Sequence, residues 1–263
     1  MTPETSPDTT WTSNGPAAWT RTIQSAYRLS HTLNANPMLD LRRFFGRAYV
    51  INLDIRPDRL EQFYKRAAIA GIKGIEKFRA IEGDKCPHPA WWRAGNGAWG
   101  CLMSHLRMAQ DAMMDGLSSY LVFEDDAVFA KDAADRIPEI MDSLMGVEWD
   151  QLYLGGQHLW VESGPPWPFR KGIVRCRNVN RTHAFAVNAR FMVDFSRHII
   201  HAPDYIAATT DNHIDHQLGV LHERRHHLIL GANPWIVGQG SSSSNITGSM
   251  KGEEWWQSTG WFQ

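Results

Sequence analysis

The sequence predicts an α/β protein with a mainly parallel central sheet flanked by helices. Short apolar runs rich in β-branched and aromatic residues, at 48–53, 120–123 and 151–154, predict buried strands. Between them lie longer segments whose apolar residues recur at helical spacing. This alternation of strands and helices is typical of α/β sandwiches.

The other elements follow from local patterns along the chain. Pro57 suits the first turn of a helix, and apolar residues recur every three or four positions after it. The segment 86–100 is rich in Pro, Gly and Trp, which predicts a loop. The remaining expected elements are a weaker strand at 78–81, helices at 102–115 and 132–145, and a strand end at Gly155-Gly156.

Composition excludes several classes of protein. With 43% apolar and 21% charged residues over 263 positions, the chain is neither disordered nor fibrous. A net charge of -1 disfavours non-specific binding to nucleic acid. The three cysteines form no CxxC pair, so a disulfide framework or zinc ribbon is not expected. Neither a transmembrane segment nor a signal sequence is evident, so we expect a cytoplasmic protein, which does not exclude peripheral membrane contact.

Four regions are expected along the chain. Residues 1–16 are polar and predict a flexible tail. Residues 17–47 carry five arginines and one aspartate, which predicts a basic helical extension. The nucleotide-binding domain is expected at 48–250, and 251–263 form a Trp-rich C-terminal segment.

An acidic triplet, Glu124-Asp125-Asp126, directly follows the apolar strand at 120–123. Three adjacent carboxylates repel one another, and a divalent cation with oxygen ligands compensates that repulsion well. Ligands of α/β sheets gather where strands end. The alternative is a solvated turn in which one aspartate caps the next helix.

Further charged and polar groups lie later in the chain. Seven of the 12 histidines fall within 198–227, where one imidazole could complete a metal shell. Asp211 and Asp215 are candidate general bases, although one of them could equally cap a helix. The segment 163–193 has six basic and no acidic residues, which suits either phosphate binding or a solvated strand pair.

Several segments, in chain order, are similar to the motifs of one family. Residues 97–105 (GAWGCLMSH) are similar to a GEIGCALSH signature, and 121–126 (LVFEDD) to a metal motif ending in EDD. Further similar segments lie at 49–60, 78–83, 182–187, 214–215 and 234–246. On these segments the chain resembles glycosyltransferase family 25, which includes lipooligosaccharide and collagen galactosyltransferases. It departs from the family pattern at Ala98, where the family has Glu, and at Asn245, where it has Asp.

The resemblance implies a GT-A fold and an inverting sugar transfer. The donor would be a UDP-sugar or another nucleotide-sugar, with Mn²⁺ (or Mg²⁺) on its diphosphate, and the acceptor a hydroxyl of a glycan or lipooligosaccharide. It implies metal ligands at Asp126, Asp125 and Glu124, and a general base at Asp215 or, second, Asp211. The expected donor-side residues are Asn52, Arg56, Arg59, Glu124, Gln239 and Ser244.

Tryptophan is in excess, with 12 residues where about three or four are usual. Indoles stack well on sugars and bases. Two Trp-rich segments therefore predict acceptor contacts, although packing explains them equally well. Together with the signature histidine, the candidate acceptor residues are Trp91, Trp92, Trp99, His105, Trp255 and Trp256.

Three alternatives remain open at this stage. The two basic stretches could guide an anionic acceptor, such as a phosphorylated glycan or hydroxymethylated phage DNA, with DNA disfavoured by the net charge. The tryptophans suit a non-catalytic glycan-binding protein, against which the intact acidic triplet argues. A His/Asp metal hydrolase is the third, but neither HExxH nor CxxH is present.

Overall fold

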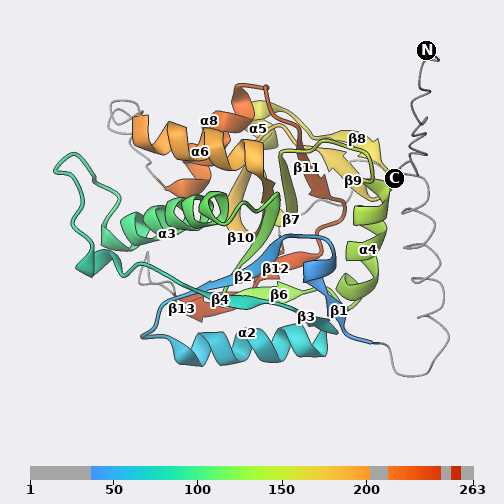
Figure 1. Ribbon diagram of the computed structural model, residues 1–263, viewed down its shortest axis with the longest axis horizontal. Helices are drawn as coiled ribbons and strands as arrows, with labels where there is room; N and C mark the ends of the chain where they lie inside the picture. Colours follow the sequence, from blue (N-terminus) through green and yellow to red (C-terminus); the bar gives the residue numbers. More distant parts are fainter. Residues whose placement is uncertain (1–36, 202–212, 244–249, 256–263) are drawn as a thin grey trace, which may run out of the picture. The chain divides into compact units, whose positions relative to one another are not determined.

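The computed structural model describes residues 37–201, 213–243 and 250–255 (Figure 1). The chain divides into two units, Met1–Pro37 and Met38–Gln263, and the described residues belong almost entirely to the second. The predicted tail at 1–16 therefore lies outside the described residues, as do three candidate site residues, Asp211, Ser244 and Trp256.

A central eight-stranded sheet forms the core of the second unit. Most of its strands run in one direction, and β10 and β9 run against the others. The predicted α/β class with a central sheet is thereby confirmed, but four of the seven neighbouring strand pairs are antiparallel, so the sheet is mixed. In spatial order the strands are β4 (Glu76–Arg79), β2 (Arg47–Asn52), β5 (Ser119–Glu124), β10 (Val179–Asn188), β7 (Gln151–His158), β11 (Ile229–Ala232), β9 (Ile173–Arg175) and β8 (Trp167–Arg170).

Helices cover the sheet on both sides. Side chains of a strand alternate between its faces, so Tyr120 and Phe123 of β5 point in opposite directions. Phe123 packs on Phe63 of α2 (Pro57–Ile69), whereas Tyr120 lies with residues of α3 (Asn96–Met114) and α6 (Ala189–His201) around a small apolar cavity. Figure 1 shows α3, α6 and α8 (Ile214–Glu223) grouped together, away from α2. The other helices are α4 (Ala133–Ser143) and the short α5 (Trp160–Ser163).

Small two-stranded sheets complete the unit. Antiparallel β6 (Ala127–Phe129) and β12 (Val237–Gln239) bring the turn after β5 beside a segment more than 100 positions later. Within the described residues, no helix combines the length and apolar composition needed to cross a bilayer. The other small elements are the strand pairs β1 (Leu39–Asp40) with β3 (Ile72–Lys73) and β13 (Ser242–Ser243) with β14 (Met250–Lys251), and the 3-10 turns η1 (Leu41–Arg43) and η2 (Gly83–Lys85).

The structure differs from the sequence-based expectation in two places. Residues 38–47, expected in the helical extension, instead form β1, η1 and the start of β2, and Leu41 is completely buried. The helix expected at 102–115 begins six positions earlier, at Asn96. Its first turns contain two glycines, Gly97 and Gly100, which are weak helix formers, so packing rather than propensity sets this beginning.

Candidate functional site

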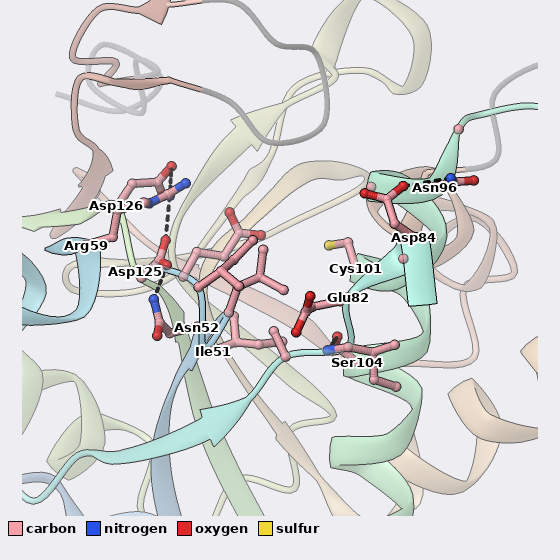
Figure 2. A pocket seen from close by; sticks show the side chains of 18 of the residues that line it. Ile51, Asn52, Arg59, Glu82, Asp84, Asn96, Cys101, Ser104, Asp125 and Asp126 are labelled. Carbon is pink, nitrogen blue, oxygen red and sulfur yellow. Dashed lines mark hydrogen bonds and ion pairs between the residues drawn. The ribbon is translucent and has the colours of Figure 1, made fainter. Parts of the chain in front are cut away.

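A pocket of about 680 Å³ lies where the parallel strands β2, β4 and β5 end. Ligands of α/β sheets bind at this edge. Figure 2 shows two groups of side chains across the pocket: Asn52, Arg59, Asp125 and Asp126 on one side, and Glu82, Asp84, Asn96, Cys101 and Ser104 on the other.

The acidic triplet forms one wall of this pocket. Glu124 ends β5, and Asp125 and Asp126 occupy the turn into β6. The Arg59 guanidinium bridges the two aspartates, with Nη2 at 2.5 Å from Asp125 Oδ1 and 2.9 Å from Asp126 Oδ2. Because Arg59 lies on the first turns of α2, the helix that packs behind β5 positions this charge.

Two amides hold the aspartates from other strands. Asn52, at the end of β2, donates from Nδ2 to Asp125 Oδ2 at 2.6 Å. Gln239, at the end of β12, donates from Nε2 to Asp126 Oδ2 at 3.1 Å. The structure therefore brings three residues that the resemblance implied, Asn52, Arg59 and Gln239, onto the triplet.

The carboxylates of the wall are short of positive charge. Burial, followed by the charge of Asp126, raises the pKa of Glu124 to about 7, although Thr182 Oγ1 donates to it at 2.5 Å. Burial also raises the pKa of Asp125 to about 6, against the lowering effects of Arg59 and Asn52. The Arg59 guanidinium thus faces a group of three carboxylates, and burial penalises the ionised forms of Glu124 and Asp125.

This donor set fits a hard divalent cation. Carboxylate oxygens are the ligands that Mg²⁺ and Mn²⁺ prefer, and a second positive charge would offset the penalty on the ionised carboxylates. Asp125, Asp126 and Glu124 all line the pocket, so they could hold such an ion beside a diphosphate.

The opposite wall contains residues that the sequence analysis missed. Asn96, at the start of α3, donates from Nδ2 to Asp84 Oδ1 at 2.7 Å. Ser104 accepts the Ile81 N–H at 2.7 Å and so ties α3 to the chain after β4. Segments 78–83 and 97–105 are similar to family motifs. That similarity indicates a family but does not indicate which side chains would line a pocket.

Two glycines explain how these segments approach so closely. A Cβ on Gly83 would lie 1.7 Å from the Asn96 carbonyl oxygen, and one on Gly100 would lie 2.5 Å from the Ile81 oxygen. Real Cβ atoms do not approach backbone so closely, so only glycine allows η2 to pack on α3. This contact closes the side of the pocket opposite the acidic triplet.

The candidate base Asp215 lies near the triplet but does not line the pocket. It is buried at the start of α8 and accepts the Arg181 N–H at 3.2 Å. The next residue, Thr182, donates to Glu124, so adjacent residues of β10 hold both carboxylates. Arg181 has a φ of 78°, an uncommon backbone conformation outside glycine that directs its N–H to Asp215.

Arg56 lies behind the triplet rather than in the main pocket. It pairs with Asp58 at 2.9 Å, and its carbonyl accepts the Asn52 amide at 2.9 Å. A smaller cavity of about 300 Å³ joins Arg56 to Arg59 and the two aspartates. Arg56 therefore lies next to Arg59 and the two aspartates, the residues beside which a nucleotide-sugar donor was predicted to bind.

None of the described tryptophan candidates lines the main pocket, and neither does His105. Trp92 is buried and donates from Nε1 to the Gly95 carbonyl at 2.8 Å, with Trp99 packed on it at 5.0 Å between ring centroids. Trp91 packs on Trp92 at 6.3 Å. This cluster supports the Gly95–Gly97 rim, so its observed contacts are packing contacts.

The other two candidates have separate surroundings. Trp255 is 39% exposed and donates from Nε1 to Glu253 at 2.7 Å. It lies against Gly238, next to the Gln239 that binds Asp126. His105 is buried in α3 and stacks on Phe185 with ring centroids 5.6 Å apart.

Part of this chain, which includes most of the pocket, is similar to a known protein family. Residues 45–162 match the model of glycosyltransferase family 25, described as an LPS biosynthesis protein family. This segment contains the pocket walls from β2, η2, α3 and β5. The predicted resemblance to family 25 is confirmed over residues 45–162, and this part of the chain is glycosyltransferase family 25-like.

Two mammalian proteins are among the relatives to which the chain is similar. The chain is 28% identical over 130 residues to the human protein named inactive glycosyltransferase 25 family member 3, and 27% identical over 129 residues to a bovine protein named probable inactive glycosyltransferase 25 family member 3. Each match covers 42% of this chain and 22% of the relative. The chain thus spans under a quarter of the length of these relatives.

Solved structures show more distant similarity. A glycosyltransferase involved in glycosylation of the major capsid of PBCV-1 shares 13% identity, with a TM-score of 0.38 over 72% of this chain and 82% of that one. Mouse xyloside xylosyltransferase 1 shares 8% identity, with a TM-score of 0.43 over 70% of this chain and 83% of that one.

Proposed function

We propose that this chain is a metal-dependent, inverting glycosyltransferase that moves a sugar from a nucleotide-sugar to an acceptor hydroxyl, most consistently on a glycan or lipooligosaccharide. The observation that carries the proposal is the triplet wall, in which Arg59, Asn52 and Gln239 hold two aspartates at the sheet edge. The pocket of about 680 Å³ is of ligand-binding size. The family match covers the same walls.

The donor binds on the triplet side in this proposal. Bound Mn²⁺ or Mg²⁺ supplies neutralisation of the diphosphate that leaves. Asp125 and Asp126 hold the ion, with Glu124 as a third oxygen ligand, and Arg59 and Arg56 bring positive charge to the phosphates or ribose. Asn52 and Gln239 fix the orientation of the two aspartates through their amide hydrogen bonds. The predicted donor residue Ser244 lies outside the described residues.

The acceptor enters from the side of η2 and α3. Asp215 is the proposed base that takes the proton of the acceptor hydroxyl, and Asp211, outside the described residues, is the second candidate. The Arg181 N–H donates to Asp215 Oδ2 and the His216 N–H donates to Oδ1, so two backbone groups orient this carboxylate. The tryptophans at 91, 92, 99, 255 and 256 remain proposed acceptor contacts, acting through the rim rather than the pocket lining.

Charge at the acceptor side bears on the alternative acceptors. Glu82 and Asp84 line the pocket opposite the triplet, so carboxylates stand on both walls. A phosphorylated glycan or hydroxymethylated DNA would bring negative charge toward them. A neutral glycan hydroxyl therefore fits this pocket better than an anionic acceptor does.

The test measures donor binding and transfer separately. Wild type and Asp126→Ala are screened with nucleotide-sugars, with Mn²⁺ or with EDTA, by thermal shift, since a ligand that binds the folded state raises the melting temperature. We expect a donor-dependent shift that requires Mn²⁺ and is lost in the variant. Product formation with glycan acceptors then separates an enzyme from a glycan-binding protein. A shift independent of both metal and Asp126 would overturn the proposal.

A further inference from the structure

Three potential metal ligands of different chemistry meet at the floor of the pocket. Cys101 and His105 are four positions apart on α3, so they share one face of the helix. Glu124, at the end of β5, lies opposite them. One ligand atom from each of Cys101, His105 and Glu124 lies within 4.8 Å of the other two.

The imidazole of His105 is unusual within this group. The side chain is 1% exposed, and neither ring nitrogen has a hydrogen-bond partner among the residues that the structure describes. Burial lowers its pKa to about 4, which favours the neutral ring, and either neutral tautomer has one ring nitrogen with a free lone pair. A buried polar group without a partner is unfavourable, so a bound ion or water is the expected compensation.

The three ligands suit a borderline-soft cation. Thiolate, neutral imidazole and carboxylate are the side chains that bind Zn²⁺, and three protein ligands leave one position for water or substrate. Asp125 and Asp126 offer only oxygen, which favours Mn²⁺ or Mg²⁺ instead. The pocket thus contains one set of ligands that prefers Zn²⁺ and another that prefers Mn²⁺ or Mg²⁺, and Glu124 lies between the two sets.

The residues that line the pocket show which way the fourth coordination position of the ion would face. Cys101 and Glu124 line the pocket, whereas His105 lies behind them in the core. Figure 2 shows the Cys101 thiol directed into the pocket from α3, on the side opposite Arg59. An ion held by all three would therefore meet pocket solvent, or an acceptor hydroxyl, at its fourth position.

We propose that Cys101, His105 and Glu124 bind one Zn²⁺ ion, with its open coordination position facing the pocket. The Cys101 thiol gives up its proton to solvent when the ion binds, and its sulfur lone pair forms the new bond. Asp125 and Asp126 remain available to a harder cation, so this site adjoins the proposed diphosphate site and shares only Glu124 with it. Zinc binding here does not depend on sugar transfer.

The test uses Co²⁺ as a coloured substitute for Zn²⁺ on the full-length, tag-free, metal-stripped chain. We expect one Co²⁺ per chain with a thiolate-to-cobalt absorption band, displaced by one equivalent of Zn²⁺. Cys101→Ser should remove the band, and His105→Asn should weaken binding by about 100-fold or more. Cys86→Ser is the matched control, because Cys86 is also a partly buried free cysteine and should leave the band unchanged.

Other variants separate this site from the proposed function. Asp126→Ala should keep the cobalt–thiolate band while losing the Mn²⁺-dependent donor shift. Far-UV circular dichroism of each variant checks that it folds, and the wild-type titration stands without any variant. The proposal is overturned if wild type shows no thiolate band, if Cys86→Ser removes it, or if His105→Asn binds Co²⁺ as wild type does. That last result would assign a water molecule to His105.

Discussion

Two buried aspartates, Asp150 and Asp125, lie at opposite ends of the central sheet, and each has an arginine beside it. Asp150 precedes β7, and Arg190 donates to its two oxygens at 2.6 and 2.5 Å. Asp125 follows β5, with Arg59 Nη2 at 2.5 Å. The pKa of Asp150 is nevertheless lowered to about 2, while the pKa of Asp125 is raised to about 6.

The neighbours of the two carboxylates explain the difference. Burial raises the pKa of Asp150, but His227, Arg190 and the Leu228 N–H outweigh it, the last donating at 2.8 Å. At Asp125 burial prevails over Arg59 and Asn52, and Asp126 adds a second negative charge. Because positive and N–H donor groups surround its ionised carboxylate, Asp150 stabilises the fold. Asp125 has too few such partners and lies beside the negative charge of Asp126, so an added cation would stabilise its ionised form.

The largest expected effect is on the rate of sugar transfer, when one carboxylate of the acidic triplet is removed. Asp126→Ala should lower the sugar-transfer rate by about 1,000-fold, since a divalent ion at a transferring group contributes several kcal/mol. Its unfolding free energy in EDTA should not fall, because one repulsive charge is removed. Steady-state kinetics and urea unfolding measure the two effects. Glu61→Gln, an exposed pair partner of Lys65, serves as control and should change neither.

Removing the charge of Asp150 should have the opposite effects, a loss of stability without a loss of donor binding. Asp150→Asn leaves donors of Arg190, His227 and Leu228 without a charged acceptor, so the unfolding free energy should fall by about 2–4 kcal/mol. The Mn²⁺-dependent donor shift should persist in the folded fraction. A loss below about 1 kcal/mol in urea unfolding would contradict the structural role assigned to this aspartate.

Acid should act on the scaffold in two ranges of pH. Burial lowers the pKa of His158 to about 4 and of His222 to about 3, so both gain protons more readily when unfolded. Stability from their neutral forms is complete above about pH 6.5 and declines as the pH falls toward those values. Asp150 keeps its charge over most of this range, because its folded pKa is about 2.

Wild type and Asp150→Asn should therefore change stability in parallel between about pH 7 and 5, because the histidines, Glu124 and Asp125, which titrate in this range, are the same in both proteins. Below about pH 4, the unfolded pKa of aspartate, the advantage of wild type should shrink as the pH falls toward 2. Urea unfolding across this series measures both curves. An advantage that vanished already at pH 5 would contradict the saturated environment of Asp150.

The parts of the fold that were predictable have local signals. The strand at 120–123 is an apolar run followed by three acids, and the structure has it as β5 with the triplet at its end. The helix after Pro57 begins at that proline, because its fixed φ suits the first turn. Such elements need only neighbouring residues to be identified.

The rest depends on contacts between distant segments. Helix α3 begins at Asn96 because Gly83 and Gly100 let η2 pack on its first turns, against the low helix propensity of glycine. Trp92 was a plausible sugar contact by residue type, but its Nε1 is bound to Gly95 in a buried cluster. Residue type predicts that a buried indole N–H will donate a hydrogen bond, but only the packed structure shows which group accepts it.

The two arginines give the smallest and most discriminating comparison. The Arg190 side chain is 56% exposed, so Arg190→Gln should lower the unfolding free energy by less than about 1 kcal/mol. Arg59 is 12% exposed and is the guanidinium that bridges Asp125 and Asp126, so Arg59→Gln should cost about 1–2 kcal/mol in EDTA. Added Mn²⁺ should restore stability to Arg59→Gln, because the ion replaces the lost positive charge, and should leave Arg190→Gln unchanged. Thermal unfolding of both variants with Mn²⁺ and with EDTA measures this difference. An equal response of the two would mean that the carboxylates after β5 do not gain more from a cation than Asp150 does.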